Sequence, residues 1–144
     1  MKMPAYDECY LESMLQKSRY LFKLIARNCD DVFRVIEDYM RGNYRSYMDI
    51  GNPLYLNKTP KQILGDMGIQ IKNYDLISEN YDEFVLEWMA DIYTLMQWTY
   101  NLKSCEIVEK IRPEELYKKY FPLHEASLKN GIEKLKNIYF DRCQ

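Results

Sequence analysis

The sequence predicts an all-α fold: a compact single domain, residues 1–144, of about six to seven helices around a central aromatic helix at residues 83–102. Three observations support this prediction. The chain has 144 residues, 47% of them hydrophobic, and a domain of this size buries about 70% of its unfolded surface. Apolar residues recur at helical spacing in several segments. No linker, repeat or low-complexity tract divides the chain.

Two helices are expected at the start of the chain. Residues 7–28 place apolar side chains at spacings of three, four and seven, as an amphipathic helix does. Asp30 or Asp31 can cap a second helix that runs to about Arg41. Gly42 suits the left-handed position that ends a helix. The two helices would form a hairpin with a short turn.

The segment from residue 43 to residue 66 is less regular. Thr59 and Pro60 read as the N-cap and first residue of a short helix, which ends at Gly68. The alternation at residues 54–56 and 69–71 predicts a very short two-stranded β ribbon beside that helix.

The second half of the chain carries further helix starts. Asn80 and Glu83 have the spacing of a capping box for the central helix. Ser104 can cap the next helix, and Pro113 can begin the one after it. The later helices are expected at residues 104–111, 113–120 and about 124 or 127 to 141.

The central helix contains both tryptophans of the chain. On a helical wheel its apolar arc, which includes Trp88, covers about 200°, so the helix needs cover on two sides. Trp98 lies on the opposite arc with Glu87 and Asp91. Either a loop or chain terminus covers Trp98 and a carboxylate accepts its indole N–H, or Trp98 anchors a partner protein.

No catalytic or cofactor motif is evident, so we expect no enzyme, no metal and no cofactor. His124 is the only histidine. In HEASL, Leu128 stands where the second histidine of the zinc motif HExxH would be. Carboxylates that are adjacent in sequence, such as Glu114 and Glu115, point about 100° apart on a helix. They therefore do not form the facing pair that acid–base chemistry needs.

Charge does not favour nucleic-acid binding. The net charge is −2 and the isoelectric point is near 5.5, so no global positive field is present. Two segments mix basic and aromatic residues, but carboxylates interrupt both. They contain Arg41, Arg45 and Lys58 with Tyr44, Tyr47 and Tyr55, and Lys110, Arg112, Lys118 and Lys119 with Tyr117 and Tyr120.

The sequence predicts a cytoplasmic protein without membrane contact. Its N-terminal stretch contains the acidic residues Asp7, Glu8 and Glu12 where a signal peptide needs an apolar core, and no apolar run reaches the length of a membrane span. The spacing of Cys9, Cys29, Cys105 and Cys143 matches no metal or redox motif, so free thiols are expected.

Two blocks of sequence occur together in one order. The first contains YLESM, DDVFRVIEDYMRGN and DIGNPLYLNKTPKQILGDM; the second contains EWMADIYTLMQWTYN, SCEIVEKIRPEELYKKY and FPLHEAS. This order resembles a family of small uncharacterised bacterial helical proteins found in toxin–antitoxin-like gene clusters. The segment EWMADIY departs from the family pattern, which has a second tryptophan there. The resemblance implies an antitoxin-like or accessory role.

These observations lead to one main functional hypothesis, a non-catalytic interaction module of antitoxin or immunity type that binds and masks the product of a neighbouring gene. A DNA-binding regulator of its own operon and a phage-type inhibitor of a host defence system are the alternatives. The candidate partner-binding residues are Trp98, Asp91, Glu87, Tyr117 and His124.

Overall fold

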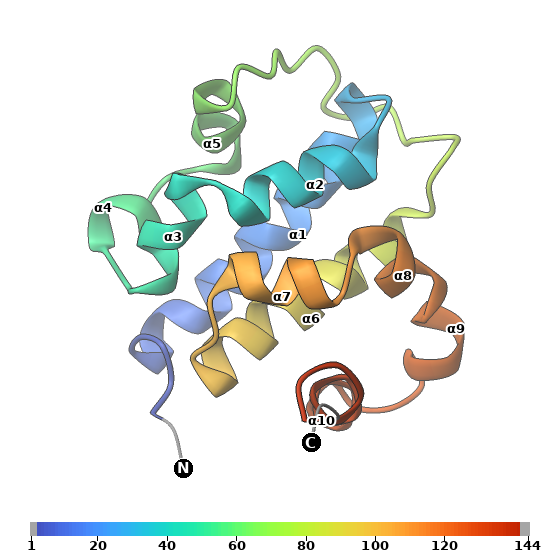
Figure 1. Cartoon of the computed structure of the whole chain (residues 1–144). Helices are drawn as coiled ribbons and strands as arrows, with labels where there is room; N and C mark the ends of the chain where they lie inside the picture. Colours follow the sequence, from blue (N-terminus) through green and yellow to red (C-terminus); the bar gives the residue numbers. More distant parts are fainter. Residues whose placement is uncertain (1–2, 142–144) are drawn as a thin grey trace.

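The computed structural model describes residues 3–141 and is helical, with α1 and α6 its longest elements at 18 residues each (Figure 1). No helix among these residues is both long and apolar enough to cross a membrane. The elements are η1 (Glu8–Tyr10), α1 (Leu11–Asn28), α2 (Val32–Arg41), α3 (Asn43–Asp49), α4 (Pro53–Leu56), α5 (Pro60–Asp66), α6 (Glu83–Tyr100), α7 (Ser104–Lys110), α8 (Pro113–Lys118), α9 (Tyr120–Leu123) and α10 (Leu128–Tyr139).

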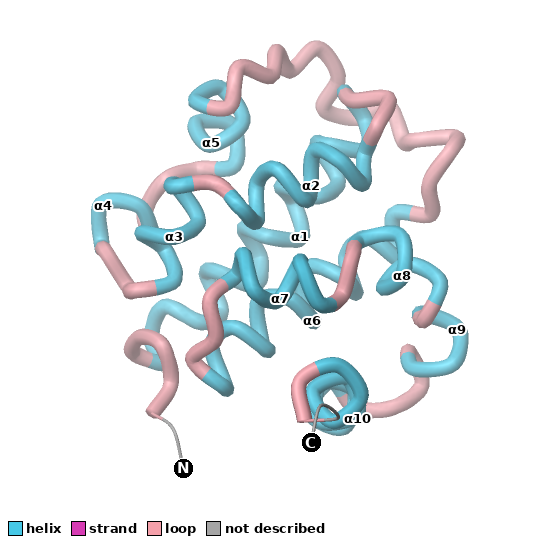
Figure 2. Tube along the Cα trace, in the orientation of Figure 1, coloured by secondary structure: helices cyan, strands magenta, loops and turns pink. Residues whose placement is uncertain are grey.

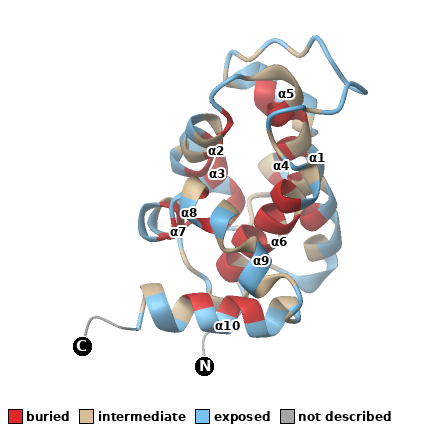
Figure 3. Cartoon of the chain, turned by 90° about the vertical axis from the view of Figure 1, so that its right-hand side faces the viewer, coloured by how far each residue is buried: buried red, intermediate tan, exposed pale blue. Residues whose placement is uncertain are grey.

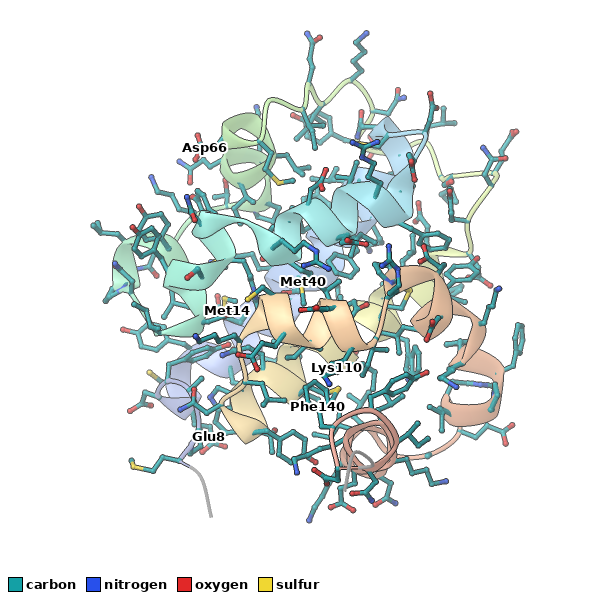
Figure 4. The ribbon with its side chains drawn as sticks, viewed as in Figure 1. Glu8, Met14, Met40, Asp66, Lys110 and Phe140 are labelled. Atoms are coloured by element: carbon teal, nitrogen blue, oxygen red, sulfur yellow. The ribbon has the colours of Figure 1, made fainter. Side chains whose placement is uncertain are left out.

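The core lies around α1 and α6, which pack side by side, with α7, α8, α9 and α10 on other sides of α6. Buried residues follow the inner faces of these helices (Figure 3). Met14 of α1 and Met40 of α2 are both buried in this core (Figure 4). This packing gives α6 cover over most of its circumference.

Three ion pairs run along the outer seam between α1 and α6. Arg19 pairs with Asp91 at 2.6 Å, Lys23 with Glu87 at 3.9 Å, and Arg27 with Glu83 at 2.8 Å. The residue numbers rise by four on α1 and fall by four on α6, one helical turn at each step. The two helices are therefore antiparallel, and the seam fixes their register.

The prediction of six to seven helices is wrong, because residues 3–141 contain ten α-helices. The additional ones are short: α3 and α4 lie in the segment that looked irregular, and α9 follows α8 after Lys119.

The predicted β ribbon is also wrong. Asn52 accepts a hydrogen bond from the Leu54 N–H and Pro53 occupies the first helical turn, so residues 53–56 form α4 instead of a strand. Residues 69–71 have no regular structure, and no strand occurs anywhere between residues 3 and 141.

Several predicted helix ends are confirmed. Thr59 and Gln62 form a capping box at the start of α5, and Gly68 has a φ of +80° just beyond its end. Glycine adopts this left-handed backbone conformation at little cost in free energy, because it has no Cβ. Asp31 caps α2, and Ser127 caps α10.

Three other terminal residues differ from expectation. Gly42 has a φ of −73° because α3 begins directly after it and uses it as N-cap. Asp82 instead of Asn80 caps α6, accepting a hydrogen bond from the Phe84 N–H. Ser104 does not cap α7 but is its first residue, buried beside Asp49.

The wheel of α6 misplaced some side chains. Thr94 and Gln97 fall on the polar arc of a helical wheel, together with Trp98, but both are buried. The Thr94 hydroxyl donates to Ser18 of α1 at 3.1 Å, and the Gln97 amide donates to the Asp49 carbonyl at 3.2 Å. Phe84 falls on the apolar arc of the wheel but is 75% exposed.

Candidate interaction surface

A long connection, residues 67–82, joins α5 to α6 without regular structure (Figure 2). Connections longer than about 12–15 residues are uncommon in compact domains and are usually functional or disordered. This one is held at defined points, which we call anchors, by side chains from α1, α2, α6 and α8.

The first anchor is Asn28, the last residue of α1. Its Oδ1 accepts hydrogen bonds from the backbone N–H groups of Lys72 at 2.7 Å and Asn73 at 2.8 Å. Its Nδ2 donates to the Asn73 carbonyl at 2.8 Å and to the Leu24 carbonyl at 2.9 Å. The side-chain amide of Asn28 therefore forms the hydrogen bonds that a neighbouring strand would otherwise form with the backbone of Lys72 and Asn73.

The second anchor is the ion pair of Arg27 and Glu83, joined by two hydrogen bonds of 2.9 and 2.8 Å. Arg27 also donates to the Tyr74 carbonyl, and Glu83 accepts from the Ser78 N–H at 3.3 Å. The hydrogen bonds from Arg27 lower the pKa of Glu83 below its ordinary value. The pair therefore belongs to the α1–α6 seam and to the loop at once.

The third anchor is a cluster of aromatic rings at the end of the loop. Tyr81 packs edge to face against Phe33 of α2, with ring centres 5.3 Å apart, and against Tyr117 of α8. The Tyr117 hydroxyl accepts a hydrogen bond from the Asp82 N–H at 2.9 Å. Tyr117, predicted to contact a partner, thus holds the loop in place.

Between the anchors the loop exposes two adjacent aliphatic side chains. Leu76 is 69% exposed and Ile77 is 65% exposed, in a segment that is largely at the surface (Figure 3). Both line an open hollow of about 460 Å³ between the loop and the end of α1. Burying one aliphatic side chain of this size stabilises a fold by about 1.5–3 kcal/mol. Leu76 and Ile77 do not contribute this stabilisation, because they remain exposed.

Carboxylates lie near these aliphatic residues, and the cations Arg27 and Lys72 also line the hollow. Asp30 and Glu79 line the hollow, and Asp75 precedes Leu76. All three are exposed, and none forms an ion pair within residues 3–141. We call this region the loop surface: Leu76 and Ile77 with Asp30, Asp75 and Glu79.

Trp98 lies elsewhere, under the N-terminal segment. It is partly buried. Its indole N–H donates to the Tyr6 carbonyl at 2.8 Å, and its own carbonyl accepts from the Ala5 N–H at 3.0 Å. A chain terminus therefore covers Trp98, and the acceptor of the indole is a backbone carbonyl instead of the expected carboxylate.

Glu87 and Asp91 belong to the ion-pair seam with Lys23 and Arg19. Burial raises the pKa of Asp91, and the hydrogen bond from Arg19 opposes this shift. Both carboxylates thus act within the α1–α6 contact.

His124 lies at the end of α9. Its ring stacks on Tyr120 with centres 4.4 Å apart, and its Nδ1 lies 2.8 Å from the Tyr120 carbonyl oxygen. Phe121 beside it is 75% exposed. The structure therefore does not bring the five predicted residues together on one surface.

A buried polar cluster was not anticipated. Arg45 is only 1% exposed, and its Nε donates to Ser104 Oγ at 2.8 Å and lies 3.2 Å from Asp49 Oδ1. The Ser104 N–H and hydroxyl donate to the two oxygens of Asp49 at 2.7 and 2.6 Å. Burial raises the pKa of Asp49, with Arg45 opposing. Because both oxygens of Asp49 accept hydrogen bonds from Ser104, the cluster connects α3 to α7.

The first basic-aromatic segment has one cation fewer at the surface than its sequence suggests, because Arg45 is buried in this cluster and cannot reach a phosphate. Arg41 pairs with Glu37 at 3.0 Å. In the second segment, Arg112 pairs with Glu37 and with Glu114. Carboxylates thus occupy the arginines of both segments.

The described part of the chain shows neither a cluster of metal-ligating side chains nor a disulfide. Residues 3–141 contain no group of histidine, cysteine and carboxylate side chains suited to a metal ion. Cys9, Cys29 and Cys105 are free thiols, and Cys143 lies outside the described residues.

Comparisons with protein-family models, with curated proteins and with solved structures gave no match to this chain. The loop surface itself was missed in the sequence. The available signal was the long interval between Gly68 and Glu83, which carries Leu76 and Ile77 but no helical periodicity.

Proposed function

We propose that this protein is a non-catalytic interaction module of antitoxin or immunity type, and that it binds a partner protein through the loop surface. The observation that carries the proposal is the exposure of Leu76 and Ile77 in a loop anchored on both sides. Exposed apolar residues with a polar rim are typical of protein interaction sites. The anchors reduce the entropy lost on binding, because the loop is already ordered.

The masking role follows from the sequence resemblance to proteins of toxin–antitoxin-like gene clusters. A phage-type inhibitor of a host defence system would need the same kind of surface. The identity of the neighbouring genes distinguishes these two roles.

The test is co-expression with the product of the neighbouring gene, followed by affinity capture. The double variant Leu76→Ser with Ile77→Ser should weaken capture by about tenfold or more. A matched control is Ile50→Ser with Leu54→Ser, because these two aliphatic residues are each 74% exposed at the α3–α4 corner. The control should bind as the original chain does. Retained binding by the loop variant together with loss in the control would move the interaction to that corner.

Trp98 provides a second test, since the sequence left open that it anchors a partner protein. Trp98→Phe removes the indole hydrogen bond to Tyr6 and keeps an aromatic ring. The proposal predicts unchanged capture for this variant, and a lost complex would return Trp98 to the interface.

The DNA-binding alternative is checked by a mobility-shift assay with the protein's own promoter. The proposal predicts no shift at low salt. A shift that disappears steeply as salt increases would support the regulator instead.

A further inference from the structure

The charges of the loop surface indicate what kind of partner fits it. Asp75 directly precedes the exposed Leu76–Ile77 pair, Glu79 follows it by two residues, and Asp30 lies on the hollow beside it. Within residues 3–141 no basic side chain pairs with any of these three. The aliphatic pair is thus flanked by carboxylates that form no ion pair among the described residues. Asp75 does lie near enough to Arg27 to help raise the pKa of that guanidinium.

The basic residues near the loop do not cancel this charge. Arg27 lines the hollow, but both of its hydrogen bonds to a carboxylate go to Glu83. Lys72 also lines the hollow. Four carboxylates, Asp30, Asp75, Glu79 and Glu83, therefore lie near two cations, Arg27 and Lys72, and the local excess is two negative charges. The whole chain has a net charge of only −2. The negative charge at the loop is therefore a local feature.

The ion-pair seam between α1 and α6 differs from the loop surface in how its carboxylates are paired. On α6, Glu83, Glu87 and Asp91 each have a basic partner on α1. Carboxylates around an exposed apolar centre repel phosphate groups and anionic lipid surfaces, and they attract ammonium and guanidinium groups.

We infer that the loop surface binds a basic amphipathic segment of the partner protein, with aliphatic or aromatic side chains against Leu76 and Ile77 and lysine or arginine near Asp30, Asp75 and Glu79. This inference rests on the proposed function and adds the chemistry of the partner. Apolar contacts would hold the segment, while the charged rim would select it and speed its association.

The test uses two synthetic peptides of about 15 residues with leucine at the same helical positions. One carries lysine at the remaining positions and the other carries glutamate. Binding is measured by calorimetry with the full chain, at salt concentrations from about 0.05 M to about 0.5 M. The lysine peptide should bind, more weakly as salt increases, and the glutamate peptide should not.

Charge-neutral variants locate the effect. The triple variant Asp30→Asn, Asp75→Asn and Glu79→Gln should weaken binding of the lysine peptide by about tenfold or more. The matched control is Glu106→Gln, Glu109→Gln and Glu133→Gln, which removes three exposed carboxylates outside the loop surface. It should change binding by less than about twofold. Circular dichroism of both variants confirms that the helices remain.

Equal binding of the two peptides, or an equal loss in the control triple, overturns the inference. The same holds if no peptide binds. These outcomes are separable from failure of the proposed function. If Leu76→Ser with Ile77→Ser loses the neighbouring-gene product while the loop charge variant retains it, the interaction surface stands and only the basic character of the partner is wrong.

Discussion

The buried Arg45 cluster and the anchored loop both depend on polar side chains. In the cluster these side chains join two helices, α3 and α7, whereas in the loop they hold a segment that has no helix hydrogen bonds of its own. In the cluster, Asp49 accepts hydrogen bonds from Ser104 and lies against Arg45, and all three side chains are enclosed. In the loop, Asn28 and Glu83 bond backbone N–H groups at the surface.

The difference between the two regions separates fold from function. The polar groups of the cluster bond one another and fix how α3 meets α7. The anchors of the loop hold residues 72–74, Ser78 and residues 81–82, and they leave Leu76 and Ile77 in solvent. An exposed apolar segment that is ordered at some cost in entropy is typical of a binding element.

The largest expected effect comes from breaking the cluster. Arg45→Met leaves the Asp49 carboxylate buried without its counter-charge, which should reduce the free energy of unfolding by about 3–5 kcal/mol. Urea denaturation measures the change. The control Arg41→Met removes a more exposed pair with Glu37 and should cost less than about 1 kcal/mol. Equal losses in the two variants would refute the structural role of Arg45.

A smaller, pH-dependent effect is expected where the helix seam meets the loop. The folded pKa of Glu83 is lowered by Arg27, so the pair stabilises the fold above the ordinary carboxyl pKa, and this stability is lost as pH falls through the folded value. Glu83→Gln should therefore cost about 1–2 kcal/mol at neutral pH.

This cost should shrink as the pH falls below the ordinary carboxyl pKa and through the lower folded pKa of Glu83, because Glu83 itself then becomes protonated. Urea unfolding of both proteins across the pH range provides the comparison. A gap that is constant with pH, or that grows in acid, would be inconsistent with the lowered pKa.

The smallest effect on global stability is expected at the loop anchor. Asn28→Ala removes the acceptor of two backbone N–H groups, but their release is local, so unfolding should change by about 1 kcal/mol. Amide exchange at Lys72 and Asn73 should become about tenfold faster or more. Asn28→Asp keeps the acceptor oxygen and should preserve most of the protection. Unaltered exchange in Asn28→Ala would mean that another contact holds the loop.

The sequence predicted the long helices well, because hydrophobic periodicity and local caps such as Thr59 and Ser127 act within a few residues. It failed for α4, where a three-residue alternation suggested a strand although Asn52 and Pro53 favour a helix start. It also failed for Thr94 and Gln97, which look like surface residues until α1 and α3 cover them.

The candidate site was harder to foresee for the same reason. The contact between Asn28 and Asn73 spans 45 residues, and the bond from Trp98 to Tyr6 spans 92. Neither leaves a local pattern. The five residues chosen from the sequence were chemically reasonable, but Trp98 and Glu87, for example, have partners in distant segments.

The most direct test of the loop surface is hydrogen exchange of the chain, alone and in complex with the neighbouring-gene product. We predict that amides at residues 75–77 exchange rapidly in the free chain and become protected in the complex, together with the end of α1 near Asn28. Protection centred on Trp98 and the N-terminal segment, with residues 75–77 unchanged, would contradict the account.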